Sequence, residues 1–471
     1  MRLLIGFAFV LSTLFSTAAT LHVGTCQTYA DPARAARDAR PGDTILVHDG
    51  TYRGTFWIEN LQGTADQYIV IRGTSRDGVR LDGGSESLHL SDCAYVRIEE
   101  LTVTGQTANG MNIDDAGSIE TPTHHIEVRH VTFTDMAASG NNDMLKLSGL
   151  EDFLIDSCVF RNGSAGGSGV DMVGCHRGII RNCTFERQGS NGIQAKGGTQ
   201  FLRIERNRFV DAGQRALNLG GSTGLQFFRP LDAPFEAADI GVYANIFLRS
   251  VAPIAYVGSV RVDVANNTII DPERWVMRIL QETVDTTRFA PCGQNMFRNN
   301  IVVMRNTLST HVNIGANTAP STFTLANNLW YMSDNVDRSR PNAPPLTEQN
   351  GLYGIDPRFV SASDLHLQPG SPAIGAGTPV DSLGVDFDGR AYAAPPSVGA
   401  FEGAVTSGVV SNAEHRPVGL VRTTRGWVLT AADAVKAIDV YDQRGKYLRS
   451  AQVAGGTHVV AGPDEYIVVR P

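Results

Sequence analysis

Between Asn109 and Ser222 the sequence repeats one pattern five times: Gly110-Met111-Asn112-Ile113-Asp114, Met144-Leu145-Lys146-Leu147-Ser148, Gly169-Val170-Asp171-Met172-Val173, Gly192-Ile193-Gln194-Ala195-Lys196 and Ala216-Leu217-Asn218-Leu219-Gly220. Each copy places apolar residues at its second and fourth positions around a polar third position. This alternation is typical of a strand with one buried face. The stretch therefore predicts a series of equivalent strands.

The spacing of these copies indicates how the strands are arranged. The third positions of the last four copies are separated by 25, 23 and 24 residues. This period is too short for a two-helix repeat and too long for a hairpin, but it suits one turn of a parallel β-solenoid, whose coils stack about 4.8 Å apart. Equivalent residues then form columns, and the outward column of third positions contains Asn112, Lys146, Asp171, Gln194 and Asn218.

A second column supports the same fold. Aligning the strands that follow each turn stacks Leu101, Val131, Cys158, Cys183, Asn207, Asn245, Asn267, Asn300 and Asn328. An apolar column that continues as an unbroken run of Asn predicts an internal amide ladder, in which each side chain bonds to its copies above and below. The sequence thus predicts an all-β chain, a right-handed parallel β-helix followed by a small C-terminal β-sandwich.

The remaining segments suggest four regions. We expect a signal peptide over residues 1–20, because Arg2 precedes a short apolar run and small residues. The parallel β-helix is expected over 21–340, terminal coils over 341–410, with a loop at 341–349, and the β-sandwich over 411–471. Asp31 is the predicted N-cap of a short helix that covers the first coil.

Charge, hydropathy and cysteines limit the choice of partners. The formal net charge of −8 gives no support to a nucleic-acid partner. No stretch after the signal peptide is long and apolar enough to be a transmembrane segment, and we expect a monomer. The six cysteines match no zinc motif, and Cys158 and Cys183 are expected to stack inside the coils. Disulfides between these two, or between Cys26 and Cys93, are possible at this stage.

The C-terminal segments resemble two known modules. Residues 356–402, which include Asp386-Phe387-Asp388-Gly389-Arg390, resemble the choice-of-anchor Q segment of bacterial β-helix proteins. The alternating strands around Ala437–Asp442 and Tyr466–Val469 resemble the C-terminal sorting domain of type IX secretion substrates, with a carbohydrate-binding module as the alternative. The resemblance implies interaction with export machinery and a secreted or cell-surface location. Asp386 and Asp388 are a candidate Ca²⁺ site, although a carboxylate-capped turn is the favoured interpretation; no other cofactor is indicated.

The outward column is the candidate site. A linear polar face on a parallel sheet matches an extended sugar chain, so Asn112, Gln194 and Asn218 are predicted to bind hydroxyl groups. The predicted substrate-binding set also includes Asp171, beside Lys146 in the column, and the flanking residues Asp143, His176 and Arg215. Two inserts, Asp115–His124 and Ser222–Asp239, are expected to form walls beside it. The alternative is a solvated face in which Lys146 simply pairs with Asp171.

One part of the column resembles a known enzyme family. Asn191-Gly192-Ile193-Gln194-Ala195-Lys196-Gly197-Gly198, followed by Arg206-Asn207-Arg208-Phe209 and Leu217-Asn218-Leu219-Gly220-Gly221, is similar to the core of polysaccharide lyase family 6. The resemblance implies β-elimination on a uronate-containing, acidic polysaccharide. It implies that Lys196 is the general base. Because a uronate lyase also needs a cation at the substrate carboxylate, we expect Lys146 or Arg229 to neutralise that group.

The sequence departs from that family in the third strand. The family has Leu-Arg-His-Gly where this chain has Leu219-Gly220-Gly221, so the assisting arginine is missing there. Arg215 lies five strand positions away, about 16 Å along the strand, which argues against cooperation with Lys196. Two alternatives stay open: a hydrolase that uses Asp114, Asp115, Asp143 or Asp171, the last with His176 as partner, and a non-catalytic surface protein that binds glycans.

Overall fold

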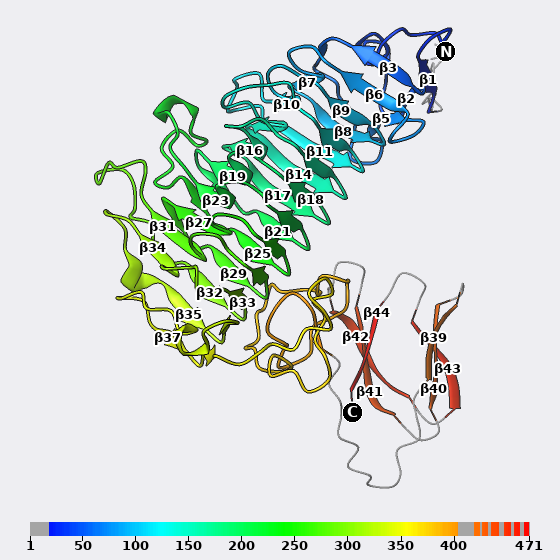
Figure 1. The fold of residues 1–471 in the computed structure, drawn as a ribbon. Helices are drawn as coiled ribbons and strands as arrows, with labels where there is room; N and C mark the ends of the chain where they lie inside the picture. Colours follow the sequence, from blue (N-terminus) through cyan, green and yellow to red (C-terminus); the bar gives the residue numbers. More distant parts are fainter. Residues whose placement is uncertain are drawn as a thin grey trace, which may run out of the picture. The chain divides into compact units, whose positions relative to one another are not determined.

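The computed structural model of the chain contains a right-handed parallel β-helix, as the sequence predicts (Figure 1). The structure describes residues 18–403 and, beyond these, the backbones of six strands between 419 and 470. Most of the predicted signal peptide lies outside the described residues. Contacts divide the chain into two compact units, 1–405 and 406–471.

Three parallel sheets form the walls of the solenoid in residues 18–403. The ten-stranded sheet carries the repeated pattern and is called the groove sheet below: β4 (Phe56–Glu59), β7 (Leu88–Ser91), β10 (Met111–Asp114), β13 (Leu145–Ser148), β16 (Ser168–Val173), β19 (Asn191–Lys196), β23 (Arg215–Gly220), β27 (Ile254–Val257), β31 (Met277–Leu280) and β34 (Val312–Ile314).

The sixteen-stranded sheet contains β1 (Thr20–Val23), β2 (Thr44–Val47), β5 (Ile69–Gly73), β8 (Ala94–Glu99), β11 (Thr123–Arg129), β14 (Leu150–Asp156), β17 (His176–Arg181), β20 (Thr199–Gln200), β21 (Arg203–Glu205), β24 (Ala237–Ala238), β25 (Gly241–Tyr243), β28 (Ser259–Val260), β29 (Asp263–Ala265), β32 (Met296–Arg298), β35 (Thr324–Ala326) and β37 (Glu348–Gln349). The twelve-stranded sheet contains β3 (Gly50–Arg53), β6 (Val79–Asp82), β9 (Thr102–Thr104), β12 (Thr132–Thr134), β15 (Val159–Arg161), β18 (Thr184–Glu186), β22 (Arg208–Val210), β26 (Ile246–Leu248), β30 (Thr268–Ile270), β33 (Ile301–Met304), β36 (Leu329–Met332) and β38 (Leu352–Tyr353).

Helical segments are short in the described part of the chain. Helix α1 (Pro32–Ala36) begins after Asp31, whose side chain accepts a hydrogen bond from the backbone N–H of Arg34, so the predicted N-cap is confirmed. It packs against β1, β2 and β4 at the first coil. Three 3₁₀ turns follow: η1 (Leu225–Phe227), η2 (Pro320–Thr322) and η3 (Val336–Arg338).

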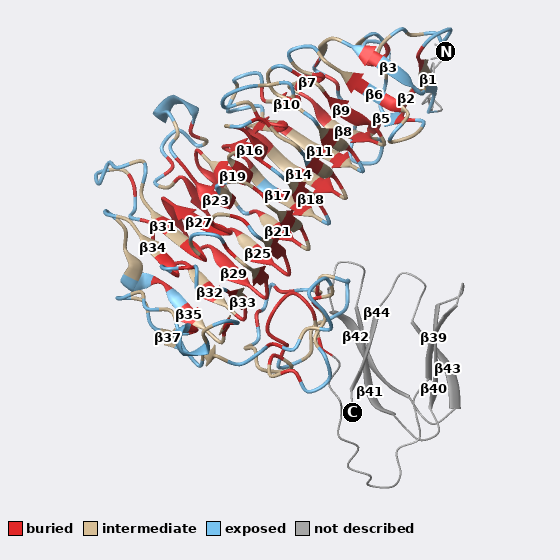
Figure 2. Ribbon diagram, in the orientation of Figure 1, coloured by how far each residue is buried: buried red, intermediate tan, exposed pale blue. Residues whose placement is uncertain are grey.

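The core is built from columns of identical or similar side chains. Buried positions alternate along strands such as β10 and β13, whereas β16 and β27 are buried throughout (Figure 2). Five phenylalanines stack with ring centroids 4.7 to 4.9 Å apart, which is the spacing of the coils themselves: Phe133, Phe160, Phe185, Phe209 and Phe247. Each coil adds one more buried side chain to such a column, so the stacked columns themselves form the core.

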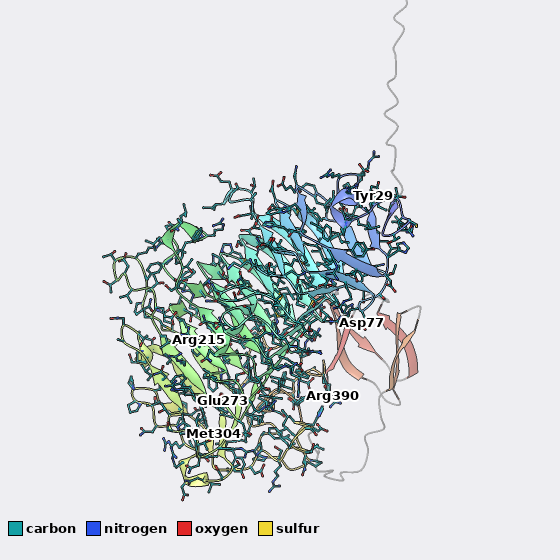
Figure 3. The ribbon with its side chains drawn as sticks, turned by 45° about the horizontal axis from the view of Figure 1, so that its top comes forward. Tyr29, Asp77, Arg215, Glu273, Met304 and Arg390 are labelled. Atoms are coloured by element: carbon teal, nitrogen blue, oxygen red, sulfur yellow. The ribbon has the colours of Figure 1, made fainter. Side chains whose placement is uncertain are left out.

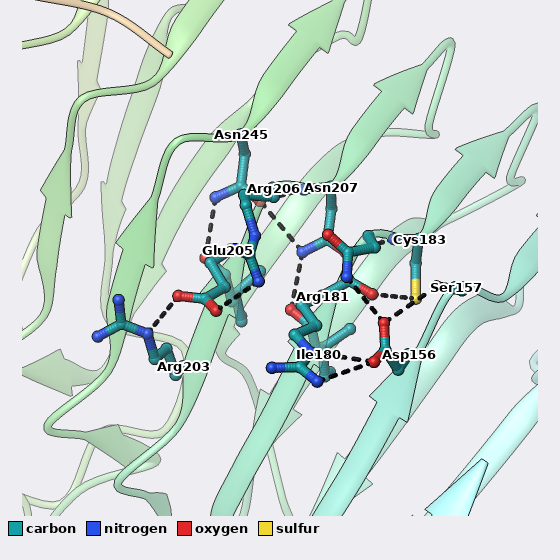
Figure 4. A network of polar contacts seen from close by, with 12 residues as sticks. Asp156, Ser157, Ile180, Arg181, Cys183, Arg203, Glu205, Arg206, Asn207 and Asn245 are labelled. Carbon is teal, nitrogen blue, oxygen red and sulfur yellow. Dashed lines mark hydrogen bonds and ion pairs between the residues drawn. The ribbon is translucent and has the colours of Figure 1, made fainter. Parts of the chain in front are cut away.

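The predicted asparagine ladder is confirmed. The Asn207 side chain donates to Asn245 Oδ1 at 3.1 Å (Figure 4). Asn245 in turn donates to Asn267 Oδ1 at 3.0 Å. Asn300 and Asn328 continue the ladder in the same way. The last acceptor is a carboxylate that sequence reasoning missed, Glu348 Oε1, at 2.8 Å from Asn328 Nδ2. The expected loop over 341–349 therefore ends in a strand, β37, which pairs with β35.

The segment after the last coil lies against the twelve-stranded sheet. Ala373 and Val398 pack on Ile301 and Leu329. Asn299, in a turn between sheets, donates to the carbonyl of Thr378 at 2.8 Å and accepts from its N–H at 3.0 Å. Residues far beyond the coils thus cover one face of the solenoid and leave the groove sheet uncovered by this segment.

The cysteines form no disulfide in the structure. All six are free, and burial raises the pKa of the Cys183 thiol, which stacks on Cys158 inside the coils as expected. The two disulfides that the sequence allowed are therefore absent. Among the described residues, no helix is long and apolar enough to cross a membrane.

The second unit consists of two antiparallel sheets, in agreement with the predicted small β-sandwich. One sheet contains β39 (Gly419–Thr423), β40 (Gly426–Ala431) and β43 (Gly456–Ala461), and the other contains β41 (Val435–Tyr441), β42 (Tyr447–Val453) and β44 (Tyr466–Arg470).

Candidate functional site

The outward column has the predicted register. Asn112 pairs with Lys146, Lys146 with Asp171, Asp171 with Gln194, and Gln194 with Asn218 on successive strands of the groove sheet. The same column begins earlier, at Trp57 and His89, and continues beyond Asn218 to Ala255 and Arg278. The five residues singled out from the sequence are the polar middle of a longer column, in which Trp57 is exposed and Ala255 is buried.

Asp171 lies between two lysines. Lys146 Nζ contacts Asp171 Oδ2 directly, and Lys196 Nζ lies 3.3 Å from the same oxygen. Lys196 reaches it from the next strand, where it stands opposite Val173. The two ammonium groups cover the carboxylate, so Asp171 is only 1% exposed and its other oxygen has no hydrogen-bond partner among the described residues.

Asp143 completes this cluster from the turn before β13. Its Oδ1 accepts the backbone N–H of Ser168 at 2.8 Å, and its Oδ2 lies 3.7 Å from Lys146 Nζ. Burial, followed by the negative charge of Asp171, raises the pKa of Asp143 to about 6. Burial lowers the pKa of Lys146, but Asp171 and then Asp143 outweigh it and the net shift is upward. Lys146 is therefore a permanent cation at neutral pH.

The second insert, Ser222–Asp239, brings Arg229 close to Lys146 and Lys196 on the groove sheet. Its guanidinium binds Asp115 through two bonds, Nε to Oδ2 at 2.5 Å and Nη2 to Oδ1 at 2.9 Å. The turns beneath require glycine at positive φ: a Cβ on Gly174 would lie 2.6 Å from Arg229 Cβ, and one on Gly149 would lie 2.1 Å from Asp115 Oδ2. These glycines let the insert lie directly on the coils.

Glu236 fixes the other end of this insert. It is fully buried, and its carboxylate accepts the backbone N–H groups of Gly197 and Thr223, both at 2.9 Å. Sequence reasoning missed this residue, whose only signal was an acid surrounded by apolar and small residues in Ala233–Ile240. Its effect is to hold Thr223 and the following turn over Lys196.

A cavity of about 340 Å³ lies between the lysines and the insert. It is lined by Lys146, Ser148, Val173, Lys196, Ser222, Thr223, Gly224, Phe227 and Arg229. Three cations, hydroxyl groups and one aromatic ring thus face one space. Phe227 is 54% exposed, whereas its neighbour Phe228 is fully buried against Phe289. Phe227 therefore faces the cavity, and Phe228 anchors the loop.

The structure does not bring His176 to Asp171. His176 begins β17, in the sixteen-stranded sheet, and its Nε2 lies 3.1 Å from the carbonyl oxygen of Arg229. Its Nδ1 lies 3.5 Å from Glu151. The turn at Gly174 carries the chain out of the groove sheet before His176, so this side chain supports the insert from below.

The other predicted residues lie in the column on either side of the lysine cluster, or next to it. Asn112 lies next to His89, and the Gln194 side chain accepts a hydrogen bond from Asn191 at 3.3 Å. Arg215 bends along its strand so that Nη1 lies 3.0 Å from Asn218 Oδ1, while Nη2 pairs with Glu282 at 2.6 Å. Arg215 does not line the cavity. It belongs to the stretch of column beyond Asn218.

The candidate calcium pair forms a capped turn. Asp386 is buried, and its oxygens accept the backbone N–H groups of Asp388, Arg390 and Glu402. Asp388 pairs with His366 at 2.7 Å. Within the described residues, no group of three or more His, Cys, Asp or Glu side chains is placed to hold a metal ion.

Comparisons with known proteins agree with the fold. The family model for the right-handed β-helix region matches residues 67–230. No curated protein sequence matches the chain. Among solved structures, pectate lyase Pel9A is 15% identical with a TM-score of 0.53, over 82% of this chain and 97% of that one. An alginate lyase from Paenibacillus sp. is 18% identical (TM-score 0.40; 64% and 96%), and the family 6 alginate lyase AlyGC is 15% identical (TM-score 0.41; 81% and 59%). The chain therefore has the fold of a parallel β-helix, which several carbohydrate-active enzymes share.

Proposed function

We propose that this protein is a polysaccharide lyase that cleaves a uronate-containing glycan by β-elimination in the cavity beside Lys196. The observation that carries the proposal is the meeting of Lys146, Lys196 and Arg229 around one space at the middle of a linear polar face. A uronate lyase needs cations at the substrate carboxylate and a base for the α proton.

The geometry suggests a role for each cation. Lys146 contacts two carboxylates, Asp171 and Asp143, which keep it protonated, so it suits neutralisation of the uronate. Lys196 contacts one carboxylate oxygen and shares it with Lys146. Lys196 lines the cavity and has fewer carboxylate contacts than Lys146, so it is the base in this proposal.

The reaction balances with Lys196 alone as the proton carrier. The amine takes the proton from the carbon next to the uronate carboxylate, the electrons of that C–H bond form the new C=C bond, and the bond to the glycosidic oxygen breaks. The proton on Lys196 then passes to the departing oxygen. Lys146 and Arg229 stabilise the negative charge that develops on the carboxylate between these two events.

The arrangement of carboxylates favours this reaction over hydrolysis. An inverting or retaining hydrolase uses two carboxyl groups that face the scissile bond. Here Asp171 is covered by lysines, Asp115 is bound by Arg229, and Asp114 is bound by His89 at 2.7 Å. Asp143 is 2% exposed and does not line the cavity.

The experiment is an absorbance assay for the unsaturated uronate, on alginate, chondroitin, heparinoid and pectic substrates. We expect Lys196→Ala and Lys196→Arg both to lower kcat by about 10²- to 10⁴-fold, because arginine keeps the charge but does not act as the base. Lys146→Arg is the matched control, because neutralisation requires only a cation. New reducing ends without absorbance would instead show a hydrolase, and neither signal on any substrate would leave a glycan-binding protein.

We propose further that the protein is exported and acts outside the cell. The apolar segment after Arg2 and the separate C-terminal β-sheet unit, which resembles a type IX sorting domain, support this. Removal of residues 411–471 should retain the chain inside a host that has type IX machinery, as judged by cell fractionation. Secretion of the shortened chain at the full level would contradict it.

A further inference from the structure

The polar face contains a second cluster of charge, four coils from Asp171, which the reaction proposed above does not use. Arg278 stands in the same column as Asn218 and Ala255, by the pairing of β23, β27 and β31. At about 4.8 Å per coil, Arg278 lies roughly 19 Å along the face from Asp171. Figure 3 labels Arg215, which lies on the intervening strand β23.

Two arginines, Arg274 and Arg278, and one tryptophan, Trp275, form this cluster. The guanidinium groups of Arg274 and Arg278 lie 4.2 and 4.4 Å from the ring centroid of Trp275. Arg278 Nε also donates to Asn313 Oδ1 at 3.0 Å, which fixes the plane of its guanidinium. The ring and the amide hold the two guanidinium groups without neutralising their charge.

The cluster has more positive charge than the described residues compensate. Glu282 pairs with Arg215, while Arg274 and Arg278 form no ion pair among the described residues. Burial, and then repulsion from Arg215, lower the pKa of Arg278. By contrast, arginines on the sixteen-stranded sheet are paired with carboxylates. Arg181 pairs with Asp156 at 2.9 Å (Figure 4), and Arg298 pairs with Asp263 at 2.7 Å.

An unpaired, oriented guanidinium is suited to a planar anion. Its fork matches a carboxylate with two parallel bonds, and stacking on the ring of Trp275 holds that fork in place. A hexuronate chain in extended form advances by about one coil spacing per sugar. A chain whose reacting sugar lies at Lys196 therefore reaches Arg278 after about three or four further sugars.

We infer that Arg278, Arg274 and Trp275 form a distant subsite that binds the carboxylate of a uronate residue about three or four sugars from the reacting one; this inference rests on the proposed function. The subsite gives the groove a preference for long anionic chains. Short oligomers bound at the cavity do not reach it, so its removal acts on long ligands alone.

The test is calorimetric binding of uronate oligomers to the full chain carrying Lys196→Ala, which prevents cleavage. A trimer and an octamer of the same uronate are compared before and after Arg278→Gln. We expect octamer affinity to fall by about tenfold or more and trimer affinity to stay unchanged. Salt screens the attraction between an arginine and a carboxylate, so the salt dependence of octamer binding should also become weaker in Arg278→Gln.

Two further variants keep the result interpretable. Arg274→Gln changes an exposed residue and should weaken octamer binding without affecting thermal unfolding. Arg305→Gln is the matched control, because this arginine lies in the twelve-stranded sheet's following turn, paired with Asp271, and should change neither oligomer.

The outcomes separate this inference from the proposed reaction. Equal binding of octamer and trimer in all variants, in a chain that does release unsaturated uronate, would overturn the subsite and leave the lyase. Octamer binding that depends on Arg278, without any turnover in the unmodified chain, would keep the subsite and overturn the lyase. Failure of every uronate octamer to bind would overturn the assignment to uronate. So would binding of a sulfated octamer of neutral sugars that depends equally on Arg278.

Discussion

Asp115 and Arg229 are 114 residues apart in the sequence and form a two-bond ion pair on the turns of the groove sheet. One comes from each of the two inserts that interrupt the coil period. Hydrogen bonding to Asp115 raises the pKa of Arg229 further above its ordinary value. The pair therefore joins the two inserts into one wall of the cavity.

Breaking this pair should destabilise the protein. Asp115 is 2% and Arg229 13% exposed at the side chain, and removal of one partner from a buried pair leaves the other charge uncompensated. We expect Asp115→Asn to lower the free energy of unfolding by about 3 kcal/mol. Urea denaturation measures it, with Arg229→Gln and the double variant completing the cycle. Additive effects of the two single changes would contradict the pairing.

Phe227 and Phe228, which are adjacent in the second insert, should respond differently to substitution. Phe228 is fully buried, so Phe228→Ala should cost about 3–5 kcal/mol of stability. Phe227 is exposed at the cavity, so Phe227→Ala should change stability by no more than about 0.5 kcal/mol but raise KM. Denaturation and initial-rate measurements on both variants check this. A stable Phe228→Ala protein would mean that the insert is not anchored there.

Asn245 should be intolerant of substitution, because four polar groups depend on it. Its side chain accepts from the backbone and side chain of Asn207 and donates to Asn267 and to the carbonyl of Ile204. We expect Asn245→Leu to destabilise by at least about 2 kcal/mol in urea denaturation, since it leaves buried partners unpaired.

The matched control for this change lies higher in the same column. Cys158 occupies an apolar level of the ladder, so Cys158→Val should cost less than about 1.5 kcal/mol. If both variants lost the same stability, the ladder would act only by filling volume.

His89 should make stability depend on pH. Its two nitrogens lie 2.7 Å from Glu86 and 2.7 Å from Asp114. Burial lowers its pKa, but the hydrogen bonds to Asp114 and Glu86 outweigh burial and raise the pKa to about 9. The folded state thus binds the proton more tightly than the unfolded chain, and the stabilisation is complete below about pH 6.5 and lost as the pH rises through about 9.

The measurement is the urea midpoint on both sides of that pH window. The unmodified protein should lose up to about 3 kcal/mol across it, and His89→Gln should lose less. An identical pH profile in both proteins would assign the dependence to another group. The ring of Trp57, stacked on His89 with centroids 3.9 Å apart, provides a local fluorescence signal for the same titration.

What the sequence could predict was set by repetition. Lys146, Asp171 and Gln194 recur at one coil period, so their register on neighbouring strands followed from counting residues, and so did the asparagine ladder. The partner of Arg229 could not be counted in this way, because both ends of that contact lie in inserts without a period.

Side-chain reach and turns explain the remaining differences. The strand position of Arg215 predicts a separation of about 16 Å from Lys196 along the strand, but the long Arg215 side chain bends toward Asn218. His176 follows Asp171 by five positions in the sequence, yet a turn between two sheets lies between them. Glu348 follows a run of asparagines as a residue of another type, so a column of identical residues gives no signal for it.

The ladder also has a direction that bears on how the protein is made. From Asn207 to Asn328, each backbone N–H and side-chain amide donates to the residue of the following coil, and Glu348 receives the last pair. A ribosome produces the chain from the other end, so during synthesis the newest coil always contains donors whose acceptor does not yet exist. Every partial chain that ends within this region therefore presents one level of donors at its open end, and Glu348 supplies the acceptor for the last such level.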